Sequence, residues 1–408
     1  MYQRKPKILI WDLYINIKNC GGPAGYLYNW QEYLKTTDKY SNIYFLKDVL
    51  KIKDQEEPKR FQYKRLLNFI YSIDLLKIRY IIKIIRMYIY WKKPTSMDLI
   101  KSIDLNEYDV IHFHVAYHLI KAIPLLKNYK GKIILTTHSP EPLSREVCAC
   151  IPAYYLHIKK FLIDKMENIE LDSWKKADYM IFPVETAIEP YYISKKLGFF
   201  LQNNKKKILF CPTSILDSEI VINRKIFKDK CNIPNDAFII TYIGRHSEIK
   251  GYDQLVKLGK IILNKYPNVY FVIGGLYKTG QVLNHPRWME LGWINYSSQL
   301  IANSDLFILP NKETYFDIVA LEVLRSGTPL MMSNTGGNKY FKSLKGNNGL
   351  RFFDYGDFNK QMNIIEDLLN MTTDERKEMR ESNQSLFHSN FRMETFFIRY
   401  ESLIETIV

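Results

Sequence analysis

Residues 306–324 carry the pattern that sets the fold, LFILPNKETYFDIVALEVL. The run at 306–309 is apolar at every position, which is typical of a strand buried on both faces of a parallel sheet. A polar loop follows, and apolar residues then recur at helical spacing from a helix start near Phe316 or Asp317. A strand, a short loop and a helix in this order form the repeating unit of α/β sheets.

The rest of the chain repeats this unit in both directions. Apolar runs predict one set of strands at 7–12, 43–46, 110–113, 132–137, 179–183 and 208–212, and a second set at 238–243, 269–274, 306–309 and 330–333. We therefore predict an α/β fold with two doubly wound, Rossmann-like sheets. In such sheets ligands bind at the carboxyl ends of the strands, so polar residues just after these runs are the candidate site.

The chain is long enough for two domains. It has 408 residues, more than the roughly 250–300 at which one hydrophobic core usually stops growing. Polar passages at 202–207 and 217–224 bracket a hinge, and we place the boundary near residue 215. We predict an N-terminal domain at 1–215, a C-terminal domain at 216–385, and an amphipathic helix at about 386–408 that packs back on the N-terminal domain.

The charge balance is strongly basic. The formal net charge of +15 favours polyanions such as nucleic acid, anionic lipid headgroups or phosphorylated small molecules. The segment 59–93 concentrates lysine and arginine among large apolar residues, with Asp74 as its single acidic residue. We expect it to contact an anionic membrane; ordinary helices with snorkelling lysines are the alternative. A nucleic-acid partner is not expected, because the sequence carries no recognisable binding module.

Targeting signals and cysteine spacing indicate the cellular compartment. The N-terminal stretch lacks the pattern of a signal peptide, and the most apolar later segment is shorter than a membrane-spanning helix and interrupted by charges. The five cysteines form neither a zinc pattern nor an obvious disulfide framework. We expect a cytoplasmic protein, peripheral on the inner face of the cell membrane.

Two cations follow the predicted strand at 238–243. Arg245 and Lys250 stand five residues apart in the loop after this strand, where two positive groups can clamp a diphosphate. When a nucleoside diphosphate leaves a sugar, negative charge grows on the leaving group, and prepositioned cations lower that barrier. The alternative is an ordinary surface loop with exposed cations.

The helix after residue 316 carries a carboxylate in an apolar run. Glu322 lies four residues after Ile318, on the same helix face, where it could accept hydrogen bonds from two ribose hydroxyls. Burying a carboxylate without a partner is costly, which favours a ligand role over core packing. The free N–H groups at the helix start favour phosphate.

Glycines and histidines mark the N-terminal half. Gly21 and Gly22 form a turn before a predicted helix, where backbone amides could approach a phosphate. His138 follows a predicted strand, and His112 and His114 alternate along another. A lone histidine after a strand is more often structural, which is our interpretation of His112. Metal binding by His112 and His114 would need a third ligand, and none is evident from the sequence.

Taken together, Gly244-Arg245, Lys250-Gly251 and Glu322 resemble the retaining GT-B glycosyltransferases of the large family-4 class, also called glycosyl transferases group 1. The resemblance implies two Rossmann-like domains that face each other across a cleft. It implies that Arg245 and Lys250 bind the donor diphosphate and that Glu322 holds the ribose. By the same resemblance, the backbone of Gly292, Trp293 and Ile294 contacts the nucleobase, and His138 lies near the reacting centre.

The chain departs from the family pattern at one place. The family's Glu-x7-Glu motif would put its first glutamate at position 314, which is Thr314 here, and Glu313 stands one place too early. Asp317 occupies a position where the family usually has glycine. Either Glu313 reaches the donor sugar, or Thr314 and Asp317 have taken over that contact, with Phe316 and Ile318 beside them.

The resemblance implies transfer from a nucleotide-sugar, UDP- rather than GDP-, to a glycan or lipid-linked acceptor in bacterial surface polysaccharide synthesis. No metal or prosthetic group is expected, because Arg245 and Lys250 replace the metal's charge. One alternative is a catalytically silent GT-B subunit that stabilises a partner transferase, motivated by the shifted glutamate. Another is a GT-B epimerase or phosphorylase, which shares the architecture and differs in chemistry.

Overall fold

A computed structural model of the protein describes all residues except 1–3, 20, 53–77, 221–222 and 277–281. The chain forms two compact units. Unit 1 comprises residues 1–182, 191–211 and 399–408, and unit 2 comprises residues 183–190 and 212–398. The chain makes a short excursion into unit 2 at 183–190, which the sequence pattern did not indicate. It returns to unit 1 within its last helix, α16 (Met393–Glu405).

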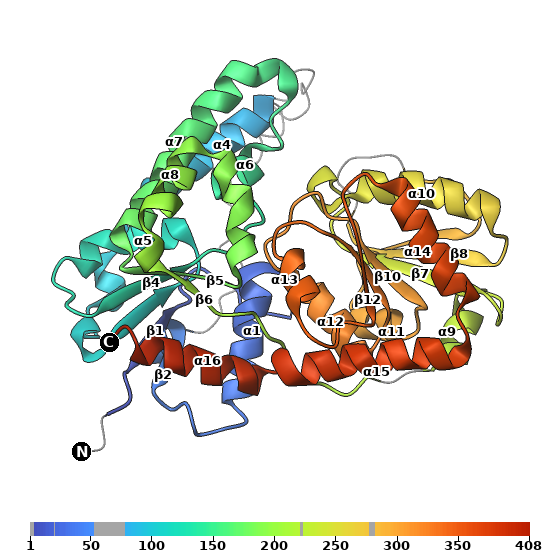
Figure 1. Ribbon diagram of the computed structural model, residues 1–408. Coiled ribbons are helices and arrows are strands. Elements are labelled where there is room, and N and C mark those ends of the chain that lie inside the picture. Colours follow the sequence, from blue (N-terminus) through green and yellow to red (C-terminus); the bar gives the residue numbers. More distant parts are fainter. Residues whose placement is uncertain (1–3, 20, 53–77, 221–222, 277–281) are drawn as a thin grey trace. The chain divides into compact units, whose positions relative to one another are not determined.

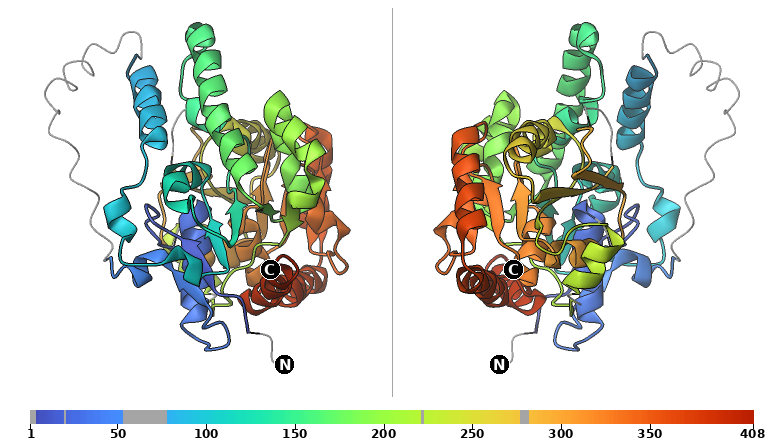
Figure 2. Two further views of the ribbon diagram at one scale, coloured as in Figure 1. Left: turned by 90° about the vertical axis from the view of Figure 1, so that its left-hand side faces the viewer. Right: turned by 90° about the vertical axis from the view of Figure 1, so that its right-hand side faces the viewer.

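Unit 1 is built on a parallel sheet of six strands in the order β2-β1-β3-β4-β5-β6 (Figure 1). The strands are β1 (Ile8–Trp11), β2 (Ile43–Phe45), β3 (Val110–Phe113), β4 (Lys132–Thr136), β5 (Tyr179–Phe182) and β6 (Ile208–Phe210). Its described helices include α1 (Gly22–Leu34), α2 (Leu46–Val49), α4 (Ile78–Lys92), α5 (Ala116–Ala122), α6 (Leu143–Cys148), α7 (Leu156–Lys176) and α8 (Lys195–Asn203). Helix α7 packs against α4 and extends beyond the sheet (Figure 1, Figure 2).

Unit 2 holds a second parallel sheet in the order β12-β11-β10-β7-β8-β9. The strands are β7 (Phe238–Ile243), β8 (Val269–Gly274), β9 (Trp288–Gly292), β10 (Leu306–Leu309), β11 (Leu330–Ser333) and β12 (Leu350–Phe353). The helices are α9 (Arg224–Lys230), α10 (Tyr252–Lys265), α11 (Ser297–Ala302), α12 (Ile318–Ser326), α13 (Asn338–Ser343), α14 (Phe358–Asn370) and α15 (Thr373–Asn390), followed by α16.

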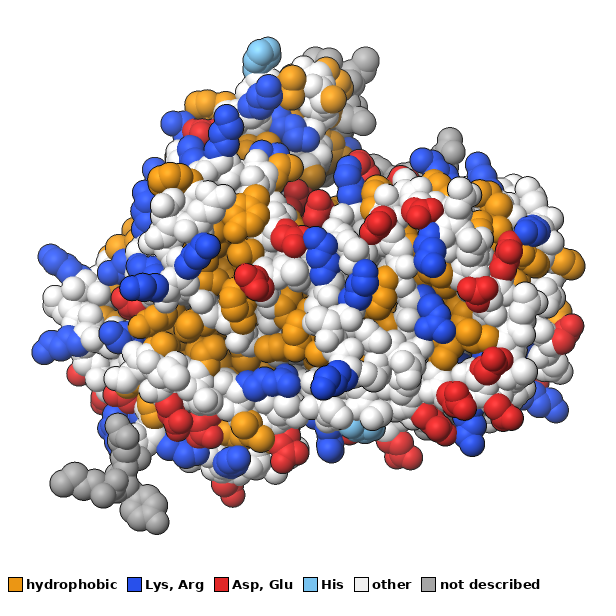
Figure 3. Space-filling view, viewed as in Figure 1, with side chains coloured by type: hydrophobic (Ala, Val, Ile, Leu, Met, Phe, Trp, Pro, Cys, Tyr) orange, Lys and Arg blue, Asp and Glu red, His pale blue; other side chains and the backbone are white. Residues whose placement is uncertain are grey.

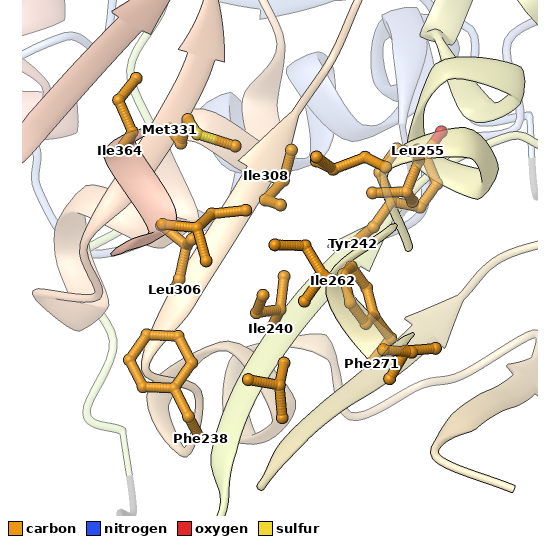
Figure 4. Close-up of a cluster of buried hydrophobic side chains, with 14 of the residues drawn as sticks. Phe238, Ile240, Tyr242, Leu255, Ile262, Phe271, Leu306, Ile308, Met331 and Ile364 are labelled. Carbon is orange, nitrogen blue, oxygen red and sulfur yellow. The ribbon is translucent and has the colours of Figure 1, made fainter. Parts of the chain in front are cut away.

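Successive residues of β7 face two different hydrophobic clusters. Phe238, Ile240 and Tyr242 join residues of α10 and α14 on one face of the sheet (Figure 4). Ile239 packs with Leu300 of α11 on the opposite face. This alternation explains why β7 is apolar apart from Thr241, because a strand covered by helices on both faces has no solvent side. The core thereby fixes the carboxyl end of β7, where the candidate cations lie.

The fold class predicted from the sequence is confirmed, and two strands were missed. Both lie at the edges of the second sheet, β9 at one side and β12 at the other. Each carries a charged residue, Glu290 in β9 and Arg351 in β12, because an edge strand is only partly covered. A search for uninterrupted apolar runs therefore passes over them. Among the described residues, no helix is both long and apolar enough to span a membrane.

Candidate functional site

The loops after β7 and β10 pack directly against each other in unit 2. Strands β7 and β10 are parallel neighbours, so their carboxyl ends lie at the same edge of the sheet. The backbone N–H groups of Lys312 and Glu313 both donate to the carbonyl oxygen of Ile249, at 3.0 and 3.3 Å. Gly251 has a φ of +69°, and a Cβ added there would lie 1.7 Å from the carbonyl oxygen of Pro310. This contact requires glycine and fixes the loop that carries Lys250.

Lys250 pairs with Asp317 across these two loops. The Nζ of Lys250 lies 2.5 Å from Oδ1 of Asp317, and the two side chains are only 15% and 16% exposed. The Nδ2 of Asn311 donates to the other carboxylate oxygen at 2.6 Å. Burial alone would raise the pKa of Asp317, but the Lys250 charge and hydrogen bonds from Lys250, Asn311 and Thr314 hold it below its usual value. Asp317 is therefore charged at neutral pH.

Arg245 stands in the same loop as Lys250, with an exposed side chain. Its carbonyl oxygen accepts a hydrogen bond from the Tyr242 hydroxyl at 2.9 Å. The preceding Gly244 donates its N–H to the carbonyl of Gly274 at 3.0 Å, which extends the pairing of β7 with β8 by one residue. The backbone of Arg245 is thus held in place, and its guanidinium is accessible to a ligand.

Between the two cations lies His246, which is buried and stacks on Tyr252 at 4.0 Å between ring centroids. Its Nε2 lies 3.7 Å from a carboxylate oxygen of Glu290. Burial lowers the pKa of His246, and the Glu290 charge opposes that shift. Neither His246 nor Asn311 could be recognised from the sequence, because each acts through contacts made only in the folded chain.

Glu322 lies on α12 and is partly buried. Burial raises its pKa, while the charge of Arg325 and a hydrogen bond from Ser297 lower it. Arg325 in turn donates to Ser298 Oγ at 3.0 Å and to the carbonyl of Leu216 at 2.7 Å. The carboxylate therefore lies among polar groups at the start of α11, which is an environment suited to a hydroxyl ligand.

The two residues at the shifted motif have different environments. Thr314 is fully buried, and its carbonyl accepts the N–H of Gly337 at 3.2 Å. A Cβ at Gly336, whose φ is +44°, would lie 2.1 Å from that carbonyl oxygen. Glu313 is partly exposed, and both burial and the nearby charge of Glu189 raise its pKa, against Lys312 and Lys339. Of the two side chains, Glu313 is the one open to solvent.

The start of α12 is anchored by Phe316. Its ring is buried and stacks on Phe341 of α13 at 5.1 Å. Asp317 follows as the N-cap residue, with its side chain bonded to Lys250 and Asn311 rather than to the helix amides. Ile318 is the first residue of the helix. The side chain of Asp317 therefore does not cap the first turn of α12.

The stretch expected to meet the base follows β9. Gly292 has a φ of +66°, and its carbonyl accepts the N–H of Gly275 at 2.7 Å. Trp293 is 66% exposed, whereas Ile294 packs so closely that a Cβ at Gly274 would lie 2.8 Å from its Cδ1. The positive φ of Gly292 explains why glycine stands there, since other residues rarely adopt it.

Gly21, Gly22 and His138 belong to unit 1. Gly21 is the N-cap residue of α1, and Gly22 has a φ of +72°. His138 follows β4, with its Nε2 3.2 Å from Nδ1 of His114 and its ring 4.8 Å from the ring of Tyr26. Burial lowers the pKa of His138 to about 3. The imidazole is therefore neutral at physiological pH and can donate or accept a hydrogen bond.

His112 has structural partners on both ring nitrogens. Its Nδ1 bonds to the Tyr400 hydroxyl and its Nε2 to Thr136 Oγ1, both at 2.8 Å. This agrees with the structural interpretation of His112. The described part of the chain contains no group of three or more His, Cys, Asp or Glu residues placed to hold a metal ion.

These features define a class of protein. Two parallel six-stranded sheets with helices packed around them form the GT-B fold of glycosyltransferases. The fold matches the crystal structure of Anabaena Alr3699/HepE in complex with UDP-glucose, with a TM-score of 0.60 and 15% sequence identity. The match covers 98% of this chain and all of the other.

The sequence comparisons give the family. Residues 223–385 match the model of the family Glycosyl transferases group 1, and over this region the chain is similar to that family. An uncharacterized 41.2 kDa protein in the cps region of Klebsiella pneumoniae is 23% identical over 74% of this chain and 82% of its own length. The O-antigen biosynthesis glycosyltransferase WclY of Escherichia coli is 23% identical over 59% of this chain and 66% of its own length.

Proposed function

We propose that this chain is a retaining glycosyltransferase. It takes a sugar from a nucleotide-sugar, UDP- rather than GDP-, and passes it to a glycan or lipid-linked acceptor in bacterial surface polysaccharide synthesis. The observation that carries the proposal is the arrangement of Arg245 and Lys250 in the loop after β7, beside the start of α12. Two cations and a helix N-terminus together favour a diphosphate.

The proposed chemistry uses the residues of unit 2 to stabilise the leaving group. Arg245 and Lys250 neutralise the charge that develops on the diphosphate, and the amides at Phe316–Ile318 add positive potential. The acceptor hydroxyl attacks the sugar on the same face from which the diphosphate leaves. The departing phosphate accepts the proton of that hydroxyl. Neither a metal nor a prosthetic group has a part in this scheme. Neutral His138 of unit 1 orients the sugar or the acceptor by a hydrogen bond.

The remaining site residues bind the nucleoside and the sugar. Glu322 accepts hydrogen bonds from the ribose hydroxyls, and the backbone at Gly292–Ile294 meets the base. We assign the sugar contact to Glu313, because its side chain is partly exposed while Thr314 is buried. Gly21 and Gly22 bring backbone amides to a phosphate. The uridine preference is supported by the UDP-glucose complex of HepE, and the polysaccharide role by the K. pneumoniae and E. coli relatives.

We further propose that the enzyme works in the cytoplasm, peripheral on the inner face of the membrane. Residues 59–77 of the basic segment lie outside the described residues. The described part of the segment consists of α4 and Lys93. Ile78, Ile85 and Ile89 recur at helical spacing along α4 and are 44%, 41% and 62% exposed. Exposed Lys83 and Arg86 flank this stripe, and α4 contains no acidic residue. An apolar stripe beside a basic one suits an anionic bilayer surface.

Exposed aromatic side chains also lie on α7, which packs against α4, and on α8, which packs against α7. Phe161 of α7 is 58% exposed, and Phe199 of α8 is 68% exposed. Figure 3 shows basic and hydrophobic side chains interspersed over α7 and α8.

The test is nucleoside-diphosphate release from a panel of UDP-, GDP- and ADP-sugars, with a membrane extract as acceptor. Wild type is compared with Lys250→Ala and Glu322→Ala. Lys257→Ala is the matched control, because Lys257 is exposed on α10 outside the site. The proposal expects release from one donor that collapses in both site variants and persists in the control. Release that is equal in all four proteins would refute it.

A silent GT-B subunit is the second candidate. It is favoured by the substitution of the motif's first glutamate by Thr314 and by the pairing of Lys250 with a carboxylate. Tight nucleotide binding without turnover of any donor would support this candidate. The intact cations and Glu322 favour the enzyme instead.

A further inference from the structure

The Lys250 ammonium is paired with a negatively charged side chain of the protein itself. Asp317 lies 2.5 Å from Lys250 Nζ, and both side chains are largely buried. A buried carboxylate at this distance neutralises much of the cation's field. A phosphate that approaches Lys250 therefore shares the ammonium with Asp317.

The Asp317 carboxylate is held from two sides. Asn311 donates to Oδ2 at 2.6 Å while Lys250 donates to Oδ1. Asn311 is fully buried, and its backbone carbonyl accepts a hydrogen bond from Ser333 Oγ at 2.6 Å. A carboxylate fixed in this way does not swing aside at low cost when a ligand arrives.

The backbones that carry the pair are fixed as well. The carbonyl of Ile249 accepts two N–H groups from the loop after β10, and Gly251 packs on Pro310. The backbone segments that carry Lys250 and Asp317 therefore keep their separation. A diphosphate bound at Lys250 must lie close to the fixed negative charge.

We infer that Asp317 weakens the binding of the nucleoside diphosphate at Lys250 and so sets how readily this product leaves. The inference rests on the proposed function, because it takes Lys250 as the diphosphate ligand. Two like charges in a partly buried site repel, and the repulsion acts on free product and on donor alike. Asp317 thereby lowers the affinity for the nucleoside diphosphate and makes its release faster.

A purely structural role for Asp317 predicts the opposite result. If the carboxylate served only to hold the loops, its removal would loosen them and weaken nucleotide binding. The direction of the change in affinity thus separates the two roles. The repulsion acts through phosphate, so it has no effect on a nucleoside that lacks phosphate.

The test titrates UDP, GDP and uridine into wild type and Asp317→Asn by calorimetry. Asparagine keeps the shape, and Asn311 can serve it after an amide rotation, because Asn311 Oδ1 is buried and accepts no hydrogen bond from the described residues. The expected result is diphosphate binding about tenfold tighter in the variant, as removal of one nearby charge implies. The gain should shrink in high salt, and uridine affinity should not change.

The outcomes separate the inference from the proposed function. If wild type binds a diphosphate and folded Asp317→Asn binds it equally or more weakly, the inference is wrong while the proposed function stands. Asp317→Ser provides a second uncharged variant, and circular dichroism establishes that each is folded. If wild type and both variants bind neither UDP nor GDP, both the inference and the proposed function fail.

Discussion

Gly251 packs directly on the carbonyl oxygen of Pro310, so that a Cβ at Gly251 would lie 1.7 Å from that oxygen. Gly251 also has a φ of +69°, in the left-handed region. This one contact joins the loop that carries Lys250 to the end of β10. The loop after β10 carries Asp317, so the geometry of the ion pair depends on a glycine.

We predict that Gly251→Ala lowers the free energy of unfolding by at least about 2 kcal/mol, since it adds a backbone clash to a strained φ. Urea unfolding measures this. Gly346→Ala is the matched control, because Gly346 has a φ of +76° and no atom within 4 Å of its added Cβ. The control should lose only about 1–2 kcal/mol, the cost of a left-handed residue. Equal losses would contradict the packing argument.

For Glu322→Gln we predict higher stability and weaker nucleotide binding. Burial raises the pKa of Glu322, so the folded state disfavours its charge, and that cost to stability grows as pH rises above the ordinary carboxyl range. Removing the charge should stabilise the free protein at pH 7 by about 0.5–2 kcal/mol. The expected UDP affinity falls about tenfold, as for a lost hydrogen bond to a charged group. Thermal unfolding with and without UDP measures both effects, and unchanged UDP affinity would contradict the assigned role.

A pH effect is predicted for Asp12, which follows β1 and is fully buried. Burial raises its pKa from 3.8 to about 6, despite the hydrogen bond from the Lys47 N–H. The folded state therefore holds this proton more tightly than the unfolded chain does. Stability from this group is present at low pH and is lost as pH rises from 3.8 through about 6.

Asp12→Asn should remove this loss. Between pH 4 and pH 7, the free energy of unfolding of the variant should rise relative to wild type by up to about 3 kcal/mol. Urea unfolding midpoints across that range provide the measurement. Asp98→Asn is the control, since the Asp98 side chain is 77% exposed. A difference between Asp12→Asn and wild type that stays constant with pH would show that the carboxyl does not titrate as described.

The membrane proposal makes a prediction for α4. Ile89→Ser should reduce sedimentation with vesicles that contain anionic phospholipid at low salt by about threefold to tenfold, as loss of one inserted apolar side chain implies. Ile261→Ser is the control, because Ile261 is 44% exposed on α10 of unit 2. Equal binding by wild type and Ile89→Ser, or no binding by wild type, would refute the role of α4.

Much of the architecture could be predicted from the sequence because buried parallel strands are uninterrupted apolar runs. Strands β7 and β10 were recognised in this way, whereas β9 and β12 escaped because edge strands tolerate Glu290 and Arg351. Local sequence motifs predicted Arg245 and Lys250 as site residues. The pairing of Lys250 with Asp317 could not be predicted, because 67 residues separate the partners and only the adjacency of β7 and β10 joins them.

The most direct test of the central claim follows labelled sugar from a UDP-sugar into the acceptors of a membrane extract. The account predicts incorporation by wild type and by Lys257→Ala, and loss of at least about a hundredfold in Lys250→Ala, as for removal of one group that stabilises the transition state. Incorporation by Lys250→Ala at the wild-type rate would contradict the claim that this loop binds the leaving diphosphate.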